Sequence, residues 1–180
     1  MFNIVTAVIV ADFIAGFFHW LEDTYCSDGL PFVGELICDP NIDHHVRPAG
    51  MKEGSIVSRN WIQWLLCAAV LFITYLIFGC VSWWWFTVMF VVSWTNEVHA
   101  WQHGAINNEF TKFVFDTGII QSKLNHSKHH KPPYMSGYCI LLDINNAWMD
   151  RVGFWRGLET VIGWFGLKPR RELRRDYVRV

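Results

Sequence analysis

A long run without charged residues constrains this chain most strongly. Residues 61–96 contain no Asp, Glu, Lys or Arg. At about 1.5 Å per residue, such a run can cross a hydrocarbon layer of roughly 30 Å twice. A water-soluble helix would show a polar face at every turn, and this run does not. The pattern predicts two membrane spans, at about 61–79 and 80–103, with a turn between them near Gly79 and Ser82.

A third apolar segment, at about 2–20, carries Asp12 as its only charge. We expect Asp12 to face the interior of a helix bundle, because exposing a carboxyl group to lipid is costly. It then either lines a substrate channel or makes a hydrogen bond between helices. The segment has no basic residue before its apolar run and no small-x-small cleavage site after it, so we expect it to stay in the protein. The 180 residues then form one domain, with a loop at 22–60 and a tail at 104–180.

Basic residues predict the orientation of these spans. All 15 Lys and Arg residues lie in loop 22–60 or in the tail after the third span. With three spans, loop and tail share one face, which the positive-inside rule predicts to be cytoplasmic. We expect a multi-pass protein of the endoplasmic reticulum in a eukaryote, or of the inner membrane in a bacterium. The basic tail end KPRRELRRDYVRV suits either anionic lipid headgroups or plain solvation, and no nucleic-acid partner is expected.

The cysteines and the aromatic residues complete the predicted architecture. The 5 cysteines are odd in number and scattered, so the sequence predicts neither a disulfide framework nor a thiolate zinc site, consistent with a reducing face. A short helix is expected near 109–124. An amphipathic stretch near 146–166 lies either in the membrane interface or against the spans. The prediction is an all-α integral membrane helical bundle, with about three transmembrane helices, short interfacial helices and an interfacial belt at Trp83–Trp85.

All histidines fall into four short clusters at or just beyond predicted span ends, on one face. The clusters are FFHWLED, NIDHHVRP, NEVHAWQHG and LNHSKHHKP, which hold His19, then His44 and His45, then His99 and His103, then His126, His129 and His130. Residues four apart project from the same side of a helix, and neutral imidazole is the usual nitrogen ligand of zinc, iron and copper. One such pair is ordinary at a membrane interface. All 8 on one face predict a metal centre.

The number of candidate ligands predicts two ions. Eight imidazoles and Asp23, which follows His19 by four residues, exceed one coordination shell and suit two ions with open positions. Nitrogen ligation without thiolate favours two iron ions over a di-zinc hydrolase, and two haems would leave HSKHH unexplained. Asp43 and Glu97 either accept the second ring N–H of a liganding histidine or are interfacial charges. Asn96 and Asn125 are weaker candidates for that acceptor role.

These motifs resemble one known family in order and over about residues 10 to 170. The motifs are ADFIAGFFHWLEDTY, DHHVRP, TNEVHAWQH, HSKHHKPPYMSGYCI and RVGFWRGLE. The chain resembles the lipid desaturase family of plasmanylethanolamine desaturase, which includes the bacterial CarF proteins and a plant chloroplast desaturase acting on phosphatidylglycerol. HAWQH and PPYMSGYC are closer to the plant branch and GFWRGLE to the plasmalogen branch. Gly118 stands about where some plasmalogen-branch members carry a further histidine.

The resemblance implies a membrane di-iron enzyme that uses O2 and two electrons to remove two hydrogens from a phospholipid chain. It places the family's histidines at the 8 histidines of this chain and its acidic position at Asp23. A b-type cytochrome or a ferredoxin is the implied electron donor. We expect formation of the vinyl ether bond of plasmalogens, with a fatty acyl desaturase, a lipid hydroxylase and a non-catalytic metal-binding scaffold or transporter as alternatives. Unactivated C–H bonds require a metal oxidant, which the protein must position and protect.

Overall fold

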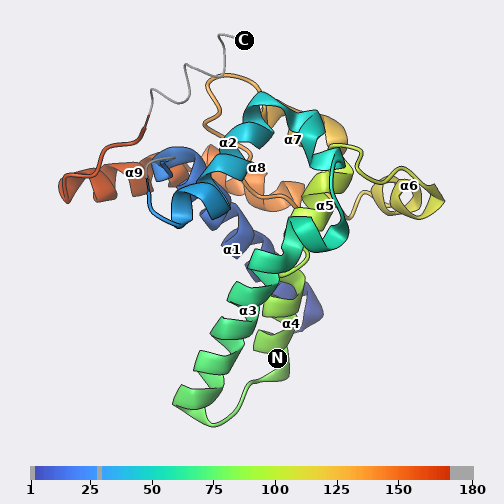
Figure 1. Ribbon diagram of the computed structural model, residues 1–180, viewed down its shortest axis with the longest axis horizontal. Helices are drawn as coiled ribbons and strands as arrows, with labels where there is room; N and C mark the ends of the chain where they lie inside the picture. Colours follow the sequence, from blue (N-terminus) through green and yellow to red (C-terminus); the bar gives the residue numbers. More distant parts are fainter. Residues whose placement is uncertain (1–2, 28–29, 171–180) are drawn as a thin grey trace.

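The computed structural model describes residues 3–27 and 30–170, and every regular element in these ranges is a helix (Figure 1). In chain order the elements are α1 (Ile4–Tyr25), η1 (Gly34–Cys38), α2 (Asp39–Val46), η2 (Pro48–Lys52), α3 (Ile56–Phe78), α4 (Trp83–Val92), α5 (Thr95–Gln102), α6 (Glu109–Asp116), α7 (Lys123–His129), α8 (Asp143–Arg151) and α9 (Phe154–Trp164). The expectation of an all-α chain is confirmed for these residues.

Three helices form an elongated stem, which we define as α3, α4 and the first half of α1. In Figure 1 the stem runs to the bottom of the view, and α2, α5, α7 and α8 gather at its upper end. Small side chains of α1 let the helices approach closely. Ala7 and Ala11 pack on Val88 and Met89 of α4 within one buried cluster. The turn between α3 and α4 lies where the sequence predicts it, because Gly79 ends α3 in a left-handed conformation with a φ of 70°.

Two described helices are long and apolar enough to cross a membrane. They are α1, with 22 residues and a mean hydropathy of 1.9, and α3, with 23 residues and a mean hydropathy of 2.1. The apolar window of α3 is only 6% buried within the protein. The central helix of a water-soluble domain would bury most of that surface.

The third predicted span, 80–103, is not one helix. The structure breaks it into α4, which has 10 residues, and α5, which has 8. Hydroxyl groups at the break satisfy carbonyls that a continuous helix would use. The Ser93 side chain donates to Phe90 O at 2.7 Å, and the Thr95 side chain donates to Val92 O at 2.9 Å.

Two further expected helices are also divided. The region 109–124 contains α6 and α7, and the region 146–166 contains α8 and α9. Gly118 and Gly153 lie between the members of each pair, both with a φ of 67°, which L side chains rarely adopt. In Figure 1, α6 and α9 project to opposite sides of the molecule. Of the two roles expected of the amphipathic stretch, packing against the spans is supported, because Trp155 of α9 is buried in one cluster with Trp20 of α1, whereas Trp164 is 77% exposed.

A disulfide between Cys26 and Cys38 corrects the prediction that the cysteines stay unpaired. The two lie 12 residues apart, and the chain turns back after α1 to bring their Cα atoms to 5.4 Å. An odd cysteine count without a C-x-x-C motif gave no sign of this pair. The bond joins the end of α1 to the start of α2, and the cysteines no longer support a reducing face. Residues 171–180, most of the basic tail end, lie outside the described residues.

Candidate metal centre

The structure brings all 8 histidines of the chain together, at the end of the stem opposite the α3–α4 turn. They fall into two adjacent groups. The five-histidine group is His44, His99, His103, His126 and His130, and the aspartate group is His19, Asp23, His45 and His129. Within each group, one candidate ligand atom of every residue lies within 4.8 Å of all the others. The neighbours His44 and His45 belong to different groups, so the two groups share a border.

Four short helical segments position these side chains. The spacing of four residues puts His19 and Asp23 on one side of the last turns of α1. Helix α2 carries the adjacent pair of histidines, α5 carries His99 and ends at His103, and α7 carries two histidines and ends at His130. The sequence pattern therefore predicted correctly which segments meet, although residues 19 to 130 are distant along the chain.

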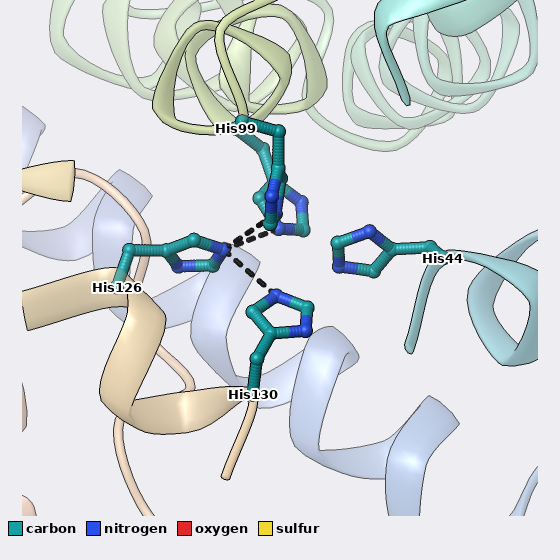
Figure 2. Close-up of side chains that lie close together, drawn as sticks. His44, His99, His126 and His130 are labelled. Atoms are coloured by element: carbon teal, nitrogen blue, oxygen red, sulfur yellow. Dashed lines mark hydrogen bonds between the residues drawn. The ribbon is translucent and has the colours of Figure 1, made fainter. Parts of the chain in front are cut away.

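In the five-histidine group the ring nitrogens crowd around His126 (Figure 2). His126 Nε2 lies 2.9 Å from His99 Nε2, 2.9 Å from His103 Nε2 and 3.1 Å from His130 Nε2. One imidazole nitrogen has one in-plane position, which holds either a proton or a lone pair. At most one of these three contacts can therefore be a hydrogen bond. A cation among the nitrogens would satisfy all of their lone pairs.

The aspartate group shows the same need for a cation. His19 Nδ1 donates to Tyr138 O at 3.0 Å, and His129 Nδ1 donates to Ser136 O at 2.8 Å. In a neutral ring the proton at Nδ1 leaves a lone pair at Nε2. Both Nε2 atoms face Asp23 Oδ2, at 3.8 Å for His19 and 3.2 Å for His129. All three atoms are buried without a hydrogen-bond partner. Lone pairs facing a carboxylate oxygen repel one another unless a positive ion lies between them.

Burial keeps the imidazoles of His44, His126 and His130 in the neutral form that binds metal. Burial lowers the pKa of His44 and His126 well below the usual range, and the neighbouring histidines lower it further. The pKa of His130 is lowered for the same two reasons. These rings are therefore neutral at neutral pH, and their lone pairs are available without the release of a proton.

Sequence reasoning missed Asn41, which helps to orient the single carboxylate. Asn41 Nδ2 donates to Asp23 Oδ1 at 2.8 Å, and His45 Nε2 lies 2.9 Å from the same oxygen. Asn41 and His45 are four residues apart on α2 and so lie on the same side of the helix, and this spacing could have indicated Asn41 from the sequence. The carbonyls of Ser136 and Tyr138 were missed as well. Main-chain acceptors leave no mark in a sequence, so no pattern would have found them.

Of the two roles considered for Asp43 and Glu97, the structure does not support that of an acceptor for a second ring N–H. Asp43 points to the surface and accepts from Arg47 at 2.9 Å, and the two side chains are 50% and 66% exposed. Glu97 is buried but binds Arg59 through both oxygens, at 2.9 and 3.0 Å. The two asparagines bond elsewhere. Asn96 donates to Arg59 O, and Asn125 donates to Asp143 at 2.7 Å.

Asp12 lies inside the bundle, as expected, and hydrogen-bonds there. Its side chain is fully buried. Its carboxyl oxygens accept from the backbone N–H groups of Ile140, Leu141 and Leu142. Of the two roles considered, the structure supports the hydrogen-bonding one, and its partners are an irregular segment and Asn145 of helix α8, which donates to Asp12 Oδ2 at 2.9 Å.

Fold and site together define a helical protein with a buried, histidine-rich site that can hold metal ions. Comparison with known proteins identifies the family. The model of the lipid desaturase domain matches residues 8–172. The chain therefore belongs to the lipid desaturase family and is an oxidoreductase, which confirms the resemblance seen in its motifs.

Named relatives span several branches of this family. The chain is 29% identical to plasmanylethanolamine desaturase 1 of Mus musculus, covering 93% of this chain and 67% of that protein. It is 30% identical to a probable fatty acid desaturase of Acanthamoeba polyphaga mimivirus, covering 93% and 85%. It is 28% identical to the chloroplastic fatty acid desaturase 4-like 2 of Arabidopsis thaliana, covering 90% and 60%. No solved structure gives a significant match.

Proposed function

We propose that this chain is a membrane-bound di-iron lipid desaturase. The observation that carries the proposal is the convergence of eight histidines and Asp23 into two adjacent groups at one end of an apolar helical stem. Membership in the lipid desaturase family favours an enzyme over a metal-binding scaffold or transporter.

The donor set supports iron rather than zinc. Five imidazoles exceed the four ligands of a tetrahedral zinc site. Nitrogens at ~2.1 Å from an ion would be about 3.0 Å apart in neighbouring positions of an octahedron and about 3.4 Å apart in a tetrahedron. The nitrogens around His126 are 2.9 to 3.1 Å apart, which fits the octahedron. Mixed histidine and carboxylate ligation with open positions is typical of non-haem iron oxygenases.

The protein's own residues hold and isolate the reaction site. Bound iron would supply the oxidising power that removes two hydrogens from an unactivated lipid chain. The reaction consumes one O2, two electrons and two protons. Together with the two hydrogens removed from the lipid, these give two waters and leave an alkene or a vinyl ether. The carbonyls of Ser136 and Tyr138 fix the tautomers of His129 and His19, and Asp23 supplies the one carboxylate. The buried rings keep water away from the site.

The stem supports a position in the membrane. We place α1, α3 and the α4–α5 pair as three crossings, with the α3–α4 turn on one face and the histidines on the other. The outward apolar surface of α3, where Phe72, Leu76 and Phe78 are each at least 62% exposed, is what lipid would cover. The distribution of Lys and Arg supports a cytoplasmic position of the histidines. The proposed membrane is the endoplasmic reticulum of a eukaryote or the inner membrane of a bacterium.

The favoured substrate is plasmanylethanolamine, whose alkyl ether would become a vinyl ether. A fatty acyl chain of a phospholipid such as phosphatidylglycerol is the second candidate, because relatives with both kinds of name match this chain. A lipid hydroxylase would use the same residues. The electrons would come from a b-type cytochrome or a ferredoxin.

Lipid mass spectrometry of a host without plasmalogens tests the proposal. Expression of the chain should yield lipids lighter by two hydrogens, whereas a gain of one oxygen would identify a hydroxylase. His103→Ala and His129→Ala, one from each group, should abolish the product and leave membrane insertion unchanged. Lys128→Ala, an exposed neighbour of both groups, is the matched control and should retain activity. An unchanged lipid profile with the parent chain, together with less than one iron per purified chain, would reject the proposal.

A further inference from the structure

A short segment, residues 136–142, supplies the carbonyls that orient two candidate ligands. Ser136 O accepts from His129, and Tyr138 O accepts from His19. Both histidines belong to the aspartate group. A hydrogen bond at Nδ1 sets the tautomer and the direction of the ring, and it points the lone pair of Nε2 at the ion. The position of this segment therefore decides where two of the four ligand atoms of the aspartate group point.

Asp12 of α1 holds this segment in place. Its Oδ1 accepts the backbone N–H groups of Ile140 and Leu141 at 3.0 and 2.7 Å. Its Oδ2 accepts the backbone N–H of Leu142 at 3.2 Å and the side-chain amide of Asn145 at 2.9 Å. One fully buried carboxyl group thus receives four donors. Three come from the main chain that follows the two carbonyls.

Gly16 allows the segment to lie directly on α1. A Cβ at this position would be 2.5 Å from Cys139 Sγ and 3.0 Å from Cys139 Cα. The backbone contact cannot be relieved by turning a side chain, so an alanine would push the segment away. Asp12, Gly16, His19 and Asp23 are spaced by four, three and four residues, which puts them on one face of α1. The same face therefore docks the segment and presents two candidate ligands.

Helix α8 holds the segment from the other side. Asn146 Oδ1 accepts the backbone N–H of Cys139 at 2.8 Å, and Asn146 Nδ2 donates to Cys139 O at 2.7 Å. Asp150 Oδ2 accepts the backbone N–H of Gly137 at 3.1 Å. Gly137 has a φ of 74° and lies between the two carbonyls that bind histidines. The path of the backbone is thus fixed on both sides of the Tyr138 carbonyl and directly after the Ser136 carbonyl.

Helix α5, which positions His99 and His103 of the five-histidine group, has more than one anchor. Gln102 of α5 donates to Ile140 O at 2.7 Å, which links α5 to the segment. However, α5 is also held through Glu97, which binds Arg59 and Asn60 of α3. Loosening the segment therefore removes one of several supports of α5. It removes the hydrogen bonds that orient His19 and His129.

We propose that Asp12 and Gly16 are positioning residues that set the metal affinity of the aspartate group through segment 136–142. The inference rests on the proposed two-ion site. Neither residue touches the ions or the substrate. Their effect passes through the carbonyls of Ser136 and Tyr138, so it is selective for one of the two ions.

Counting iron in the purified full-length protein tests this selectivity. Asp12→Asn replaces one acceptor oxygen by an NH2 group, which faces N–H donors of the segment. We expect Asp12→Asn to lower the iron content from two per chain to one. Combined with His129→Ala, it should give the same content as His129→Ala alone, because both changes affect the same ion. Combined with His103→Ala, it should leave none. Thr6→Val, which removes a bond to Trp84 earlier on the same helix, should keep both irons.

Each other outcome has a defined meaning. The inference would be overturned if Asp12→Asn kept two irons and released them to a chelator at the same rate as the parent protein. It would also be overturned if this single variant lost both irons. Fewer than two irons in the parent would instead reject the proposed two-ion site. If Asp12→Asn fails to insert, Asn146→Ala carries the test, because it loosens the same segment from α8 and should lose the same ion. Retention of both irons by Asn146→Ala would then overturn the inference.

Discussion

Removing the charge of Glu97 should destabilise the junction between α3 and α5. The Glu97 side chain is 1% exposed and that of Arg59 is 10% exposed, and Glu97 also accepts from Asn60 and Trp101. Breaking a buried ion pair by removing one partner costs about 3–5 kcal/mol. Arg59 keeps its hydrogen bond to Gly54 O, so we expect Glu97→Gln to fall at the lower end, about 3 kcal/mol.

Thermal unfolding in detergent, followed by tryptophan fluorescence, measures this cost. In a protein of this size 1 kcal/mol shifts the Tm by about 2–4 °C, so the expected loss is roughly 6–12 °C. Asp43→Asn is the matched control. It removes a carboxylate from an exposed pair with Arg47, and such pairs contribute at most about 1 kcal/mol.

A double-mutant cycle shows whether the pair itself is responsible. Arg59→Met leaves the Glu97 carboxylate buried without its cation, so it should also be costly. The double variant should cost less than the sum of the two single variants, because neither charge is then left unpaired. A shift below roughly 2 °C for Glu97→Gln, or strictly additive costs, would refute this account of the junction.

Three further predictions concern the metal, the orientation and the disulfide. Extracting the metal with a chelator should lower the Tm, because an ion that binds only the folded protein at 1,000 times its Kd stabilises by about 4.1 kcal/mol; an unchanged Tm after complete extraction would contradict this. Cys80, exposed at the turn opposite the histidines, should react with a membrane-impermeant maleimide added to intact bacterial cells that express the chain in the inner membrane, whereas labelling only after permeabilisation of that membrane would reverse the proposed orientation. Cys26→Ser should lower the Tm under non-reducing conditions, because closing a loop of about this length contributes ~3 kcal/mol; equal Tm values would argue against the Cys26–Cys38 bond in solution.

The sequence predicted which histidines come together better than it predicted the helix boundaries. Charge-free runs mark apolar helices because charged side chains are costly in apolar surroundings, and spacings of four mark the histidine pairs because a helix has one geometry. The break at Ser93 could not be seen, since hydroxyl side chains are common inside helices and also bond to backbone carbonyls. The breaks at Gly118 and Gly153 depend on positive φ angles, which a glycine permits but does not require.

The partners of the acidic residues could not be predicted either. Asp43 and Glu97 each lie within two residues of a histidine, so proximity along the chain suggested that they bind its ring. In the structure each carboxylate instead meets an arginine, from α3 in the case of Glu97. The real acceptors for two of the histidines are carbonyls of residues 136 and 138, and the disulfide joins cysteines without a recognisable spacing. Each of these contacts depends on how the chain folds back on itself, which residue patterns do not encode.

The composition of the two groups has an electrostatic consequence. Their imidazoles are uncharged ligands, so Asp23 is the single anion among nine candidate donors. A loaded centre would keep most of the positive charge of its ions, in surroundings that screen charge poorly. Such a field attracts an anionic phosphate group and favours the metal in its lower oxidation state, because each electron that arrives reduces the uncompensated charge.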